Sequence, residues 1–286
     1  MTHSNVQPVY RFAPSPNGYL HLGHAYSALL NFERAQKTGG RFLLRIEDID
    51  PGRSRPEFEQ AIYEDLAWLG INWEEPVLRQ SDHLAFYAEA IATLDKRGLL
   101  YPCFCSRSER MRSGSALKDP DGAPLYSGQC RQLDARLRAE KLNANLPHVK
   151  RIDMARALKD VSSALTFEEF EAAKSTRLIA AQPERWGDAV LMRKDVPTSY
   201  HVSVVLDDAR QGVTDVVRGV DLLASTDIHC LLQVLFDLPT PRYHHHDLIL
   251  DIDGDKLAKS KGSRALRDLR AEGVTPAEIR ARLGLS

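Results

Sequence analysis

The feature that most constrains this chain is a His-Leu-Gly-His stretch at residues 21–24. Residues 10–18 before it are typical of a strand that runs into a tight loop, and residues 25–35 after it favour a helix. Free backbone N–H groups and the positive end of a helix dipole meet at such a junction, which attracts phosphate. We interpret residues 21–24 as the phosphate end of a nucleotide site. A turn with two incidental histidines is the alternative.

Strands and helices alternate through the first hundred residues. Residues 41–47 form an apolar stretch that ends in charge, which predicts a buried strand, and a Pro-Gly turn follows. Apolar side chains recur at helical spacing over residues 56–69 and again over 82–97, and a glycine ends each helix. This order predicts an α/β fold with a parallel, Rossmann-like sheet.

The apolar periodicity weakens between residues 101 and 186, which we interpret as an insertion into the α/β domain. Beyond it we expect strands at residues 189–192, 199–205, 213–218 and about 248–250, with a helix at 226–236. Two short helices end the chain, the last capped by Thr275 with Pro276 in its first turn. The expected parts are a catalytic domain (8–100 and 187–250), an insertion (101–186), and a lysine loop with C-terminal helices (251–286).

Composition excludes several classes of protein. The 286 residues are 43% hydrophobic and carry a net charge of −1, as in an ordinary globular protein, so a nucleic acid would have to meet a local basic patch. The sequence shows neither a signal peptide nor an apolar run long enough for a membrane span. We therefore expect a cytoplasmic protein with no membrane partner, in which clustered cysteines indicate metal rather than disulfides.

A second candidate for phosphate binding is the lysine-rich stretch at residues 256–262, near the other end of the fold. Taken alone it could be a solvated basic turn. Together, however, the two motifs bracket the fold in the way that the two halves of a nucleotide crevice do in a parallel α/β sheet.

These motifs resemble those of the class I aminoacyl-tRNA synthetases for glutamate and glutamine. The resemblance rests on residues 11–18 with 21–24, on 45–50, on 243–250 and on 256–260, and covers nearly all of the α/β part. The loop departs from the usual Lys-Met-Ser-Lys-Ser, because Leu257 and Ala258 replace Met and the first Ser.

The resemblance implies a ligase reaction in which an amino-acid carboxylate attacks the α-phosphorus of ATP, a substrate that comes with Mg²⁺. The attacking group is already an anion, so alignment and charge stabilisation matter more than a general base. The phosphates would contact His21, Gly23 and His24, and Lys259, supported by Lys256, would stabilise the developing charge.

The same resemblance implies a pocket for L-glutamate. It carries over six residues, namely Arg11, Ala13, Ser15, Glu47, Tyr200 and Arg218. Two arginines in one pocket suit a substrate with two carboxylates. Either arginine alone would indicate no more than an ion pair on the surface. We expect Glu47 to bind the ammonium group and Arg11 to bind the γ-carboxylate.

Three of the four cysteines, Cys103, Cys105 and Cys130, lie within the insertion. From spacing alone they could be a zinc site or three reduced thiols. The resemblance to short glutamate-type enzymes implies that Tyr126 completes the ligand set of one structural zinc ion. We expect Cys230 to be a core residue. The three histidines at 244–246 cannot converge on a metal from one strand, so we place them at a sheet edge near the nucleotide.

The chain ends soon after the lysine loop, which predicts that an anticodon-binding domain is absent. This resembles the short glutamyl-queuosine tRNA(Asp) synthetases, which implies glutamate activation without tRNA, and transfer to the queuosine base in the anticodon of tRNA(Asp), by a monomer. Arginines 107, 110, 112 and 131 could meet the RNA or form a solvated face. The alternatives are a truncated glutamyl-tRNA synthetase that charges a tRNA 3′ end, a small-molecule nucleotidyltransferase, and a non-enzymatic RNA-binding protein.

Overall fold

The computed structural model describes residues 7–113, 115–171, 175–249 and 264–285. Its strands are β1 (Val9–Phe12), β2 (Arg41–Ile46), β3 (Glu74–Arg79), β4 (Leu100–Cys103), β5 (Val149–Ile152), β6 (Thr166–Phe170), β7 (Thr176–Ala180), β8 (Val190–Met192), β9 (Asp215–Gly219) and β10 (Arg242–His246). Its α-helices are α1 (Leu22–Thr38), α2 (Pro56–Trp68), α3 (Leu84–Lys96), α4 (Arg107–Ser113), α5 (Ala135–Asn143), α6 (Met154–Lys159), α7 (Tyr200–Arg210), α8 (Ser225–Leu235), α9 (Leu266–Ala271) and α10 (Pro276–Arg282). Short 3-10 helices are η1 (Gln80–His83), η2 (Pro183–Trp186) and η3 (Val220–Leu222).

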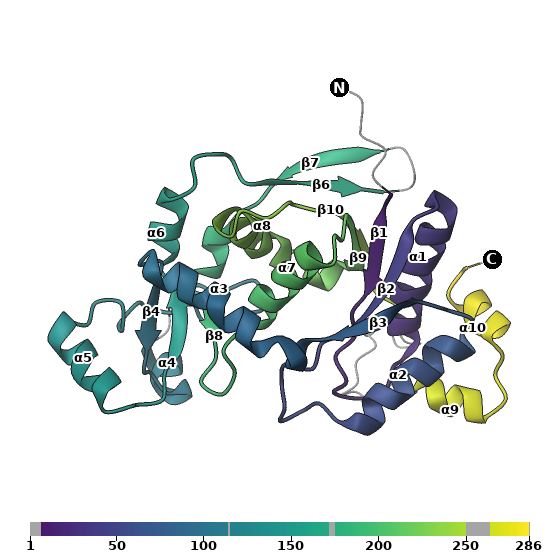
Figure 1. Ribbon diagram of the computed structural model, residues 1–286, viewed down its shortest axis with the longest axis horizontal. Coiled ribbons are helices and arrows are strands. Elements are labelled where there is room, and N and C mark those ends of the chain that lie inside the picture. The colour runs from purple at the N-terminus through teal and green to yellow at the C-terminus, as the bar shows by residue number, and fades with distance from the viewer. Residues whose placement is uncertain (1–6, 114, 172–174, 250–263, 286) are drawn as a thin grey trace.

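Two arrays of parallel β-strands form the centre of the molecule (Figure 1). In one array β1 pairs with β2 and β2 with β3, and in the other β9 pairs with β10 and β10 with β6, all in parallel. The arrays meet where the Thr214 N–H donates to the Val9 carbonyl at 3.1 Å and the Thr214 hydroxyl accepts from the Val9 N–H at 2.8 Å. The predicted α/β fold with a parallel sheet is confirmed.

The region predicted to be an insertion contains two different kinds of sheet. Strands β4, β5 and β8 form a small antiparallel sheet at one end of the molecule, next to α4 and α5 (Figure 1). The hairpin of β6 and β7 instead joins the central sheet, because β6 pairs with β10. Residues 166–180 are therefore part of the sheet that carries β9 and β10.

The segment expected to be a strand at residues 199–205 is the first half of helix α7, and this prediction was wrong. Its alternating valines suggested a strand, but Val202, Val204 and Val205 are all buried in one cluster with α8. A β-branched residue disfavours a helix by only about 0.5 kcal/mol, whereas burying a valine side chain contributes about 1.5–3 kcal/mol. Tertiary packing therefore decides the conformation of this segment.

Two expectations near residue 246 also need correction. Among the described residues the last strand is β10 at Arg242–His246. Leu248 and Ile249, where we expected a strand, lie outside any strand, and Leu250 is outside the described residues. Strand β10 is also not at an edge, because it pairs with β6 on one side and β9 on the other. All three histidines pair with β9, and the His244 and His245 side chains also contact Phe170 and Glu169 of β6.

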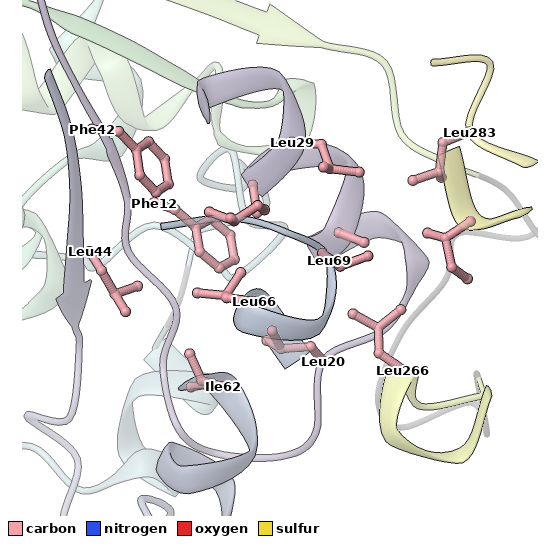
Figure 2. Packing of buried hydrophobic residues seen from close by; sticks show 14 of the residues in the cluster. Phe12, Leu20, Leu29, Phe42, Leu44, Ile62, Leu66, Leu69, Leu266 and Leu283 are labelled. Atoms are coloured by element: carbon pink, nitrogen blue, oxygen red, sulfur yellow. The ribbon is translucent and has the colours of Figure 1, made fainter. Parts of the chain in front are cut away.

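The largest hydrophobic cluster joins the first helices to the end of the chain (Figure 2). Leu29 of α1 and Leu66 of α2 pack in one cluster with Leu266 of α9 and Leu283 near α10. The backbone N–H of Leu266 also donates to the Leu20 carbonyl at 2.8 Å, one residue before the His-Leu-Gly-His stretch. The C-terminal helices thus support the start of α1. Within the described ranges, no helix is long and apolar enough to cross a membrane.

The predicted cap of the last helix is confirmed and can be tested. The Thr275 hydroxyl accepts from the Glu278 N–H at 3.3 Å, and a Glu278 carboxylate oxygen accepts from the Thr275 N–H at 2.7 Å. We expect Thr275→Ala to lower the free energy of unfolding by about 1 kcal/mol, because the Glu278 N–H loses the hydroxyl that accepts its hydrogen bond. Urea unfolding measures the change, and Thr275→Ser should stay close to wild type. Equal stability of the alanine variant would contradict the role of this cap.

Candidate active site

A cavity of about 620 Å³ opens at the carboxyl ends of β1, β2, β9 and β10. The structure places nine of the predicted site residues on its wall, namely Arg11, Ala13, Ser15, His21, Gly23, His24, Glu47, Tyr200 and Arg218. They come from four segments that are far apart in the sequence. Ligands of open α/β sheets bind in this position, outside the carboxyl ends of the strands. The predicted residues Lys256 and Lys259 lie outside the described residues.

The two histidines of the opening motif form a capping box at the start of α1. The Gly23 N–H donates to His21 Nδ1, and the His21 N–H donates to His24 Nδ1, both at 3.2 Å. Since each Nδ1 accepts, the ring proton of each neutral imidazole is on Nε2. The rings lie close together, with centroids 3.8 Å apart. This turn thus fixes both rings as N–H donors at the positive end of a helix.

Gly23 leaves room for the His21 ring. A Cβ atom at this position would lie 3.2 Å from His21 Cε1 and 3.3 Å from His21 Nδ1, which is closer than side chains normally approach. A larger residue would therefore require the ring to shift slightly from the position in which it caps the helix.

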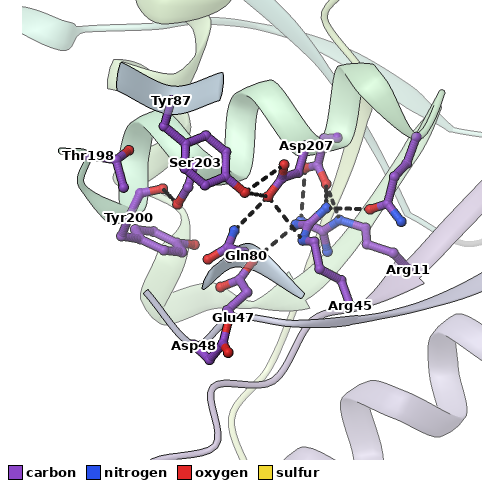
Figure 3. Close-up of polar contacts among 12 residues, drawn as sticks. Arg11, Arg45, Glu47, Asp48, Gln80, Tyr87, Thr198, Tyr200, Ser203 and Asp207 are labelled. Atoms are coloured by element: carbon purple, nitrogen blue, oxygen red, sulfur yellow. Dashed lines mark hydrogen bonds and ion pairs between the residues drawn. The ribbon is translucent and has the colours of Figure 1, made fainter. Parts of the chain in front are cut away.

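A buried ion-pair network underlies the cavity (Figure 3). Asp208 of α7 accepts from Arg45 Nη1 at 2.7 Å, and it accepts from Arg11 Nε and Nη2 at 3.1 and 3.2 Å. Although burial opposes ionisation, the two guanidinium groups hold the pKa of Asp208 below its usual range. Arg45 also donates to Glu47 at 3.0 Å. Arg45 and Asp208 were missed in the sequence, where the only signal was an arginine in the middle of an otherwise apolar strand.

Glu47 directly follows β2 and lines the cavity. Burial raises the pKa of Glu47, and the charges of Arg45 and Arg11 oppose that rise. A cationic group of a substrate would act in the same direction as these arginines. The Glu47 carboxylate is therefore suited to bind an ammonium group that has given up its hydration shell.

Arg218 of β9 also lines the cavity, and its side-chain partners are uncharged acceptors. Its Nη2 donates to the Thr226 hydroxyl at 2.7 Å, and its Nε and Nη1 lie 3.4 Å from ring nitrogens of His245 and His229. Among the described residues, Arg218 forms no ion pair. Tyr200, at the start of α7, also lines the cavity, and burial raises its pKa, so that the hydroxyl stays neutral.

The three predicted cysteines of the insertion converge. The sulfur atoms of Cys103, Cys105 and Cys130 all lie within 4.8 Å of one another. The Tyr126 hydroxyl lies 3.3 Å from the Cys105 sulfur and accepts from the Cys130 N–H at 2.9 Å. Three thiols and a phenol are a suitable donor set for zinc, so these residues could hold one ion. Cys230 lies apart from them, buried on α8, as expected.

Of the arginines considered for RNA contact, Arg131 is paired with Asp188 at 2.9 Å and holds the protein's own loops together. Arg107 and Arg110 line a second cavity of about 340 Å³ that also contains Tyr126. These two, and not Arg131, face open space beside the cysteine cluster.

The chain matches known proteins over nearly its whole length. A family model described as the catalytic domain of class I tRNA synthetases (E and Q) matches residues 8–286. A glutamyl-Q tRNA(Asp) synthetase of Rhodobacter capsulatus is 46% identical, over 97% of this chain and 100% of that protein. A glutamate–tRNA ligase of Aquifex aeolicus is 36% identical over 93% of this chain, but the match spans only 54% of that ligase.

Solved structures agree with the sequence comparison. The crystal structure of a glutamate tRNA ligase from Elizabethkingia meningosepticum in complex with its amino acid superposes with a TM-score of 0.72 and 28% identity. It covers 90% of this chain, which in turn spans about half (52%) of that ligase. The cavity, the capping histidines and these matches lead to one conclusion. The chain belongs to the class I tRNA synthetases for glutamate and glutamine, and it is a ligase of that family.

Proposed function

We propose that this ligase activates L-glutamate with ATP in the absence of tRNA and then transfers the glutamate to the queuosine base of tRNA(Asp) in the cytosol. The observation that carries the proposal is the cavity itself. It combines Arg218, a cation without a carboxylate partner among the described residues, with the donor pair His21 and His24. The relative from Rhodobacter capsulatus, which is similar from end to end, bears the name of that activity.

In the activation step an oxygen of the glutamate α-carboxylate attacks the α-phosphorus of ATP. The bond between this phosphorus and the pyrophosphate oxygen breaks, and pyrophosphate leaves with the electron pair. Mg²⁺ bound with ATP would neutralise phosphate charge. His21 and His24 donate N–H groups to the phosphates, and Lys259 of the loop, with Lys256, supplies positive charge. No base is needed, because the attacking carboxylate carries no proton at neutral pH.

The contacts of the two arginines favour a different partner for the γ-carboxylate from the one that we expected from the sequence. Arg11 is bound through Nε and Nη2 to Asp208, whereas Arg218 is held only by neutral groups. We therefore propose Arg218, rather than Arg11, as the main partner of the γ-carboxylate. Glu47, directly after β2, would bind the ammonium group.

Replacing Arg218 tests this arrangement. We expect Arg218→Gln to raise the KM for glutamate about 100-fold in ATP–pyrophosphate exchange, because a charge-assisted hydrogen bond contributes about 1.5–3 kcal/mol. The KM for ATP should change little. Arg41→Gln, which removes an exposed arginine paired with Glu74, is the matched control and should behave like wild type. An unchanged KM for glutamate in the Arg218 variant would show that another group binds the carboxylate.

The nucleic-acid acceptor is the second part of the proposal. In the transfer step a hydroxyl of queuosine attacks the carbonyl carbon of glutamyl-adenylate, AMP leaves, and the hydroxyl proton passes to a phosphate oxygen or to solvent. Charging of a tRNA 3′ end is the competing function, since relatives named glutamate–tRNA ligase are 36–40% identical. The two functions differ in which end of the tRNA carries the ester.

Charging of trimmed tRNA separates these functions. We expect radiolabelled glutamate to join queuosine-bearing tRNA(Asp) equally well with and without its 3′-terminal adenosine, and not to join tRNA(Asp) that has guanosine in place of queuosine. Acid-gel separation of charged tRNA measures the product. Charging that depends on the terminal adenosine and ignores queuosine would support the competing function.

We also propose that Cys103, Cys105, Tyr126 and Cys130 hold one structural zinc ion. Two contacts support this donor set. The Phe104 N–H donates to the Cys130 sulfur at 3.4 Å, which favours a thiolate. The Arg151 guanidinium lies 4.1 Å above the Tyr126 ring, and although burial opposes ionisation, hydrogen bonds from Tyr126 and Arg151 hold the pKa of the Cys103 thiol below its usual value. A metal here would tie together a segment with only a small hydrophobic cluster of its own.

Metal analysis of purified variants tests the zinc site. We expect one zinc ion per chain in the wild type, and a large loss with Cys130→Ser, because an alcohol is a much poorer zinc ligand than a thiolate. Cys230→Ser changes a buried cysteine outside the cluster, and it should keep full zinc content. Wild-type protein without stoichiometric zinc would refute the site.

A further inference from the structure

The surroundings of Arg218 are built from two elements that converge on its guanidinium group. Strand β10 places His245 directly beside Arg218 in the parallel register, and helix α8 contributes Thr226 and His229 one turn apart. These three residues, which we call the neutral shell, contact Nε, Nη1 and Nη2 at 3.4, 3.4 and 2.7 Å. Each guanidinium nitrogen therefore has one fixed neighbour in the shell.

The positions of the ring protons follow from the partners on each side. Arg218 can only donate, so His229 accepts through Nδ1 and carries its proton on Nε2, which faces His201 Nδ1 at 3.2 Å. His245 donates through Nδ1 to a Glu169 carboxylate oxygen at 3.0 Å, so its Nε2 accepts from Arg218 and from the Thr226 hydroxyl at 3.1 Å. Both histidines thus face Arg218 with a lone pair.

The shell also carries no charge. Burial, and then the charge of Arg218, lower the pKa of His245 to about 3 and hold that of His229 well below its usual value. On one face the guanidinium lies 5.3 Å from the centre of the Tyr243 ring, which is uncharged as well. This contrasts with Arg11 and Arg45, whose charges are balanced by Asp208.

The number of donors decides what Arg218 can still bind. A guanidinium group has five N–H bonds, and the shell occupies one on each nitrogen. One N–H then remains on Nη1 and one on Nη2, and the two oxygens of a carboxylate can accept from such donors. The positive charge also remains, because no carboxylate of the described residues pairs with Arg218.

We propose that Thr226, His229 and His245 are positioning residues that determine the specificity for the substrate side chain, because they fix Arg218 through neutral acceptors and leave its charge for a carboxylate. The inference rests on the proposed glutamate activation. A glutamine side chain would bring no charge, and its amide N–H₂ could face only donors of Arg218. A buried donor without a partner is strongly disfavoured, and this favours glutamate over glutamine.

A pair of nearly isosteric variants tests the importance of neutrality. In His229→Asn the side-chain oxygen replaces Nδ1 as a neutral acceptor, and His229→Asp has the same shape with a negative charge. Both variants lose the contact with His201, so charge is the difference between them. In ATP–pyrophosphate exchange we expect the Asp variant to have at least a ten-fold higher KM for glutamate than the Asn variant. The ratio of kcat/KM for glutamate to that for glutamine should fall with it.

A second pair tests the acceptor itself and stays informative if the aspartate variant fails to fold. Thr226→Val removes the hydroxyl with little change in shape, and Thr226→Ser keeps it. We expect the valine variant to raise the KM for glutamate about ten-fold with little change in kcat, and serine to restore it. A purely structural role would instead lower the melting temperature and kcat in both variants.

The outcomes separate this inference from the proposed function. If the wild type exchanges pyrophosphate with glutamate, and Thr226→Val matches Thr226→Ser in KM and selectivity, the neutral shell has no positioning role. If the wild type shows no glutamate-dependent exchange at all, the proposed function fails, and the inference fails with it.

Discussion

The structure depends most on the buried contact between Arg45 and Asp208. Arg45 is completely buried in β2, and its partner lies 163 residues later in α7. A buried charge without a partner is very costly, and Arg45 is surrounded by the carboxylates of Glu47, Asp207 and Asp208. The contact with Asp208 ties β2 to the helix that begins with Tyr200. Glu47, directly after β2, and Tyr200 are both on the cavity wall, and this contact helps to fix their relative position.

The same helix has a second anchor a residue away. Asp207 accepts from the Tyr87 hydroxyl at 2.9 and 3.0 Å and from Gln80 at 2.8 Å, which connects α7 to α3 and η1 (Figure 3). Asp207 Oδ2 also lies 4.0 Å from Arg45 Nε, so both consecutive carboxylates contact β2, and Asp207 in addition binds the outer helix. A rigid wall of this kind suits a reaction in which catalysis comes from alignment.

Sequence patterns predicted the parts of the site that are local in the chain. The His21–His24 turn, β2 and the cap at Thr275 depend on neighbours a few residues apart, and propensity and spacing report such features well. Helix α7 was mistaken for a strand because its valines face tertiary contacts that no local pattern encodes. Arg45 and Asp208 were missed for a similar reason, since nothing in either segment indicates its distant partner.

The pairing of β6 with β10 has a consequence for any attempt to reduce this ligase to a minimal catalytic core. The obvious cut would remove the whole stretch from residue 101 to residue 186. That cut would delete Glu169, which orients the His245 ring that faces Arg218. The His245 ring could then rotate, or its proton could move to the other ring nitrogen. Arg218 in the amino-acid pocket would lose a fixed neighbour, although the deleted residues lie far from it in the sequence. A viable minimal core therefore has to keep the β6–β7 hairpin (residues 166–180).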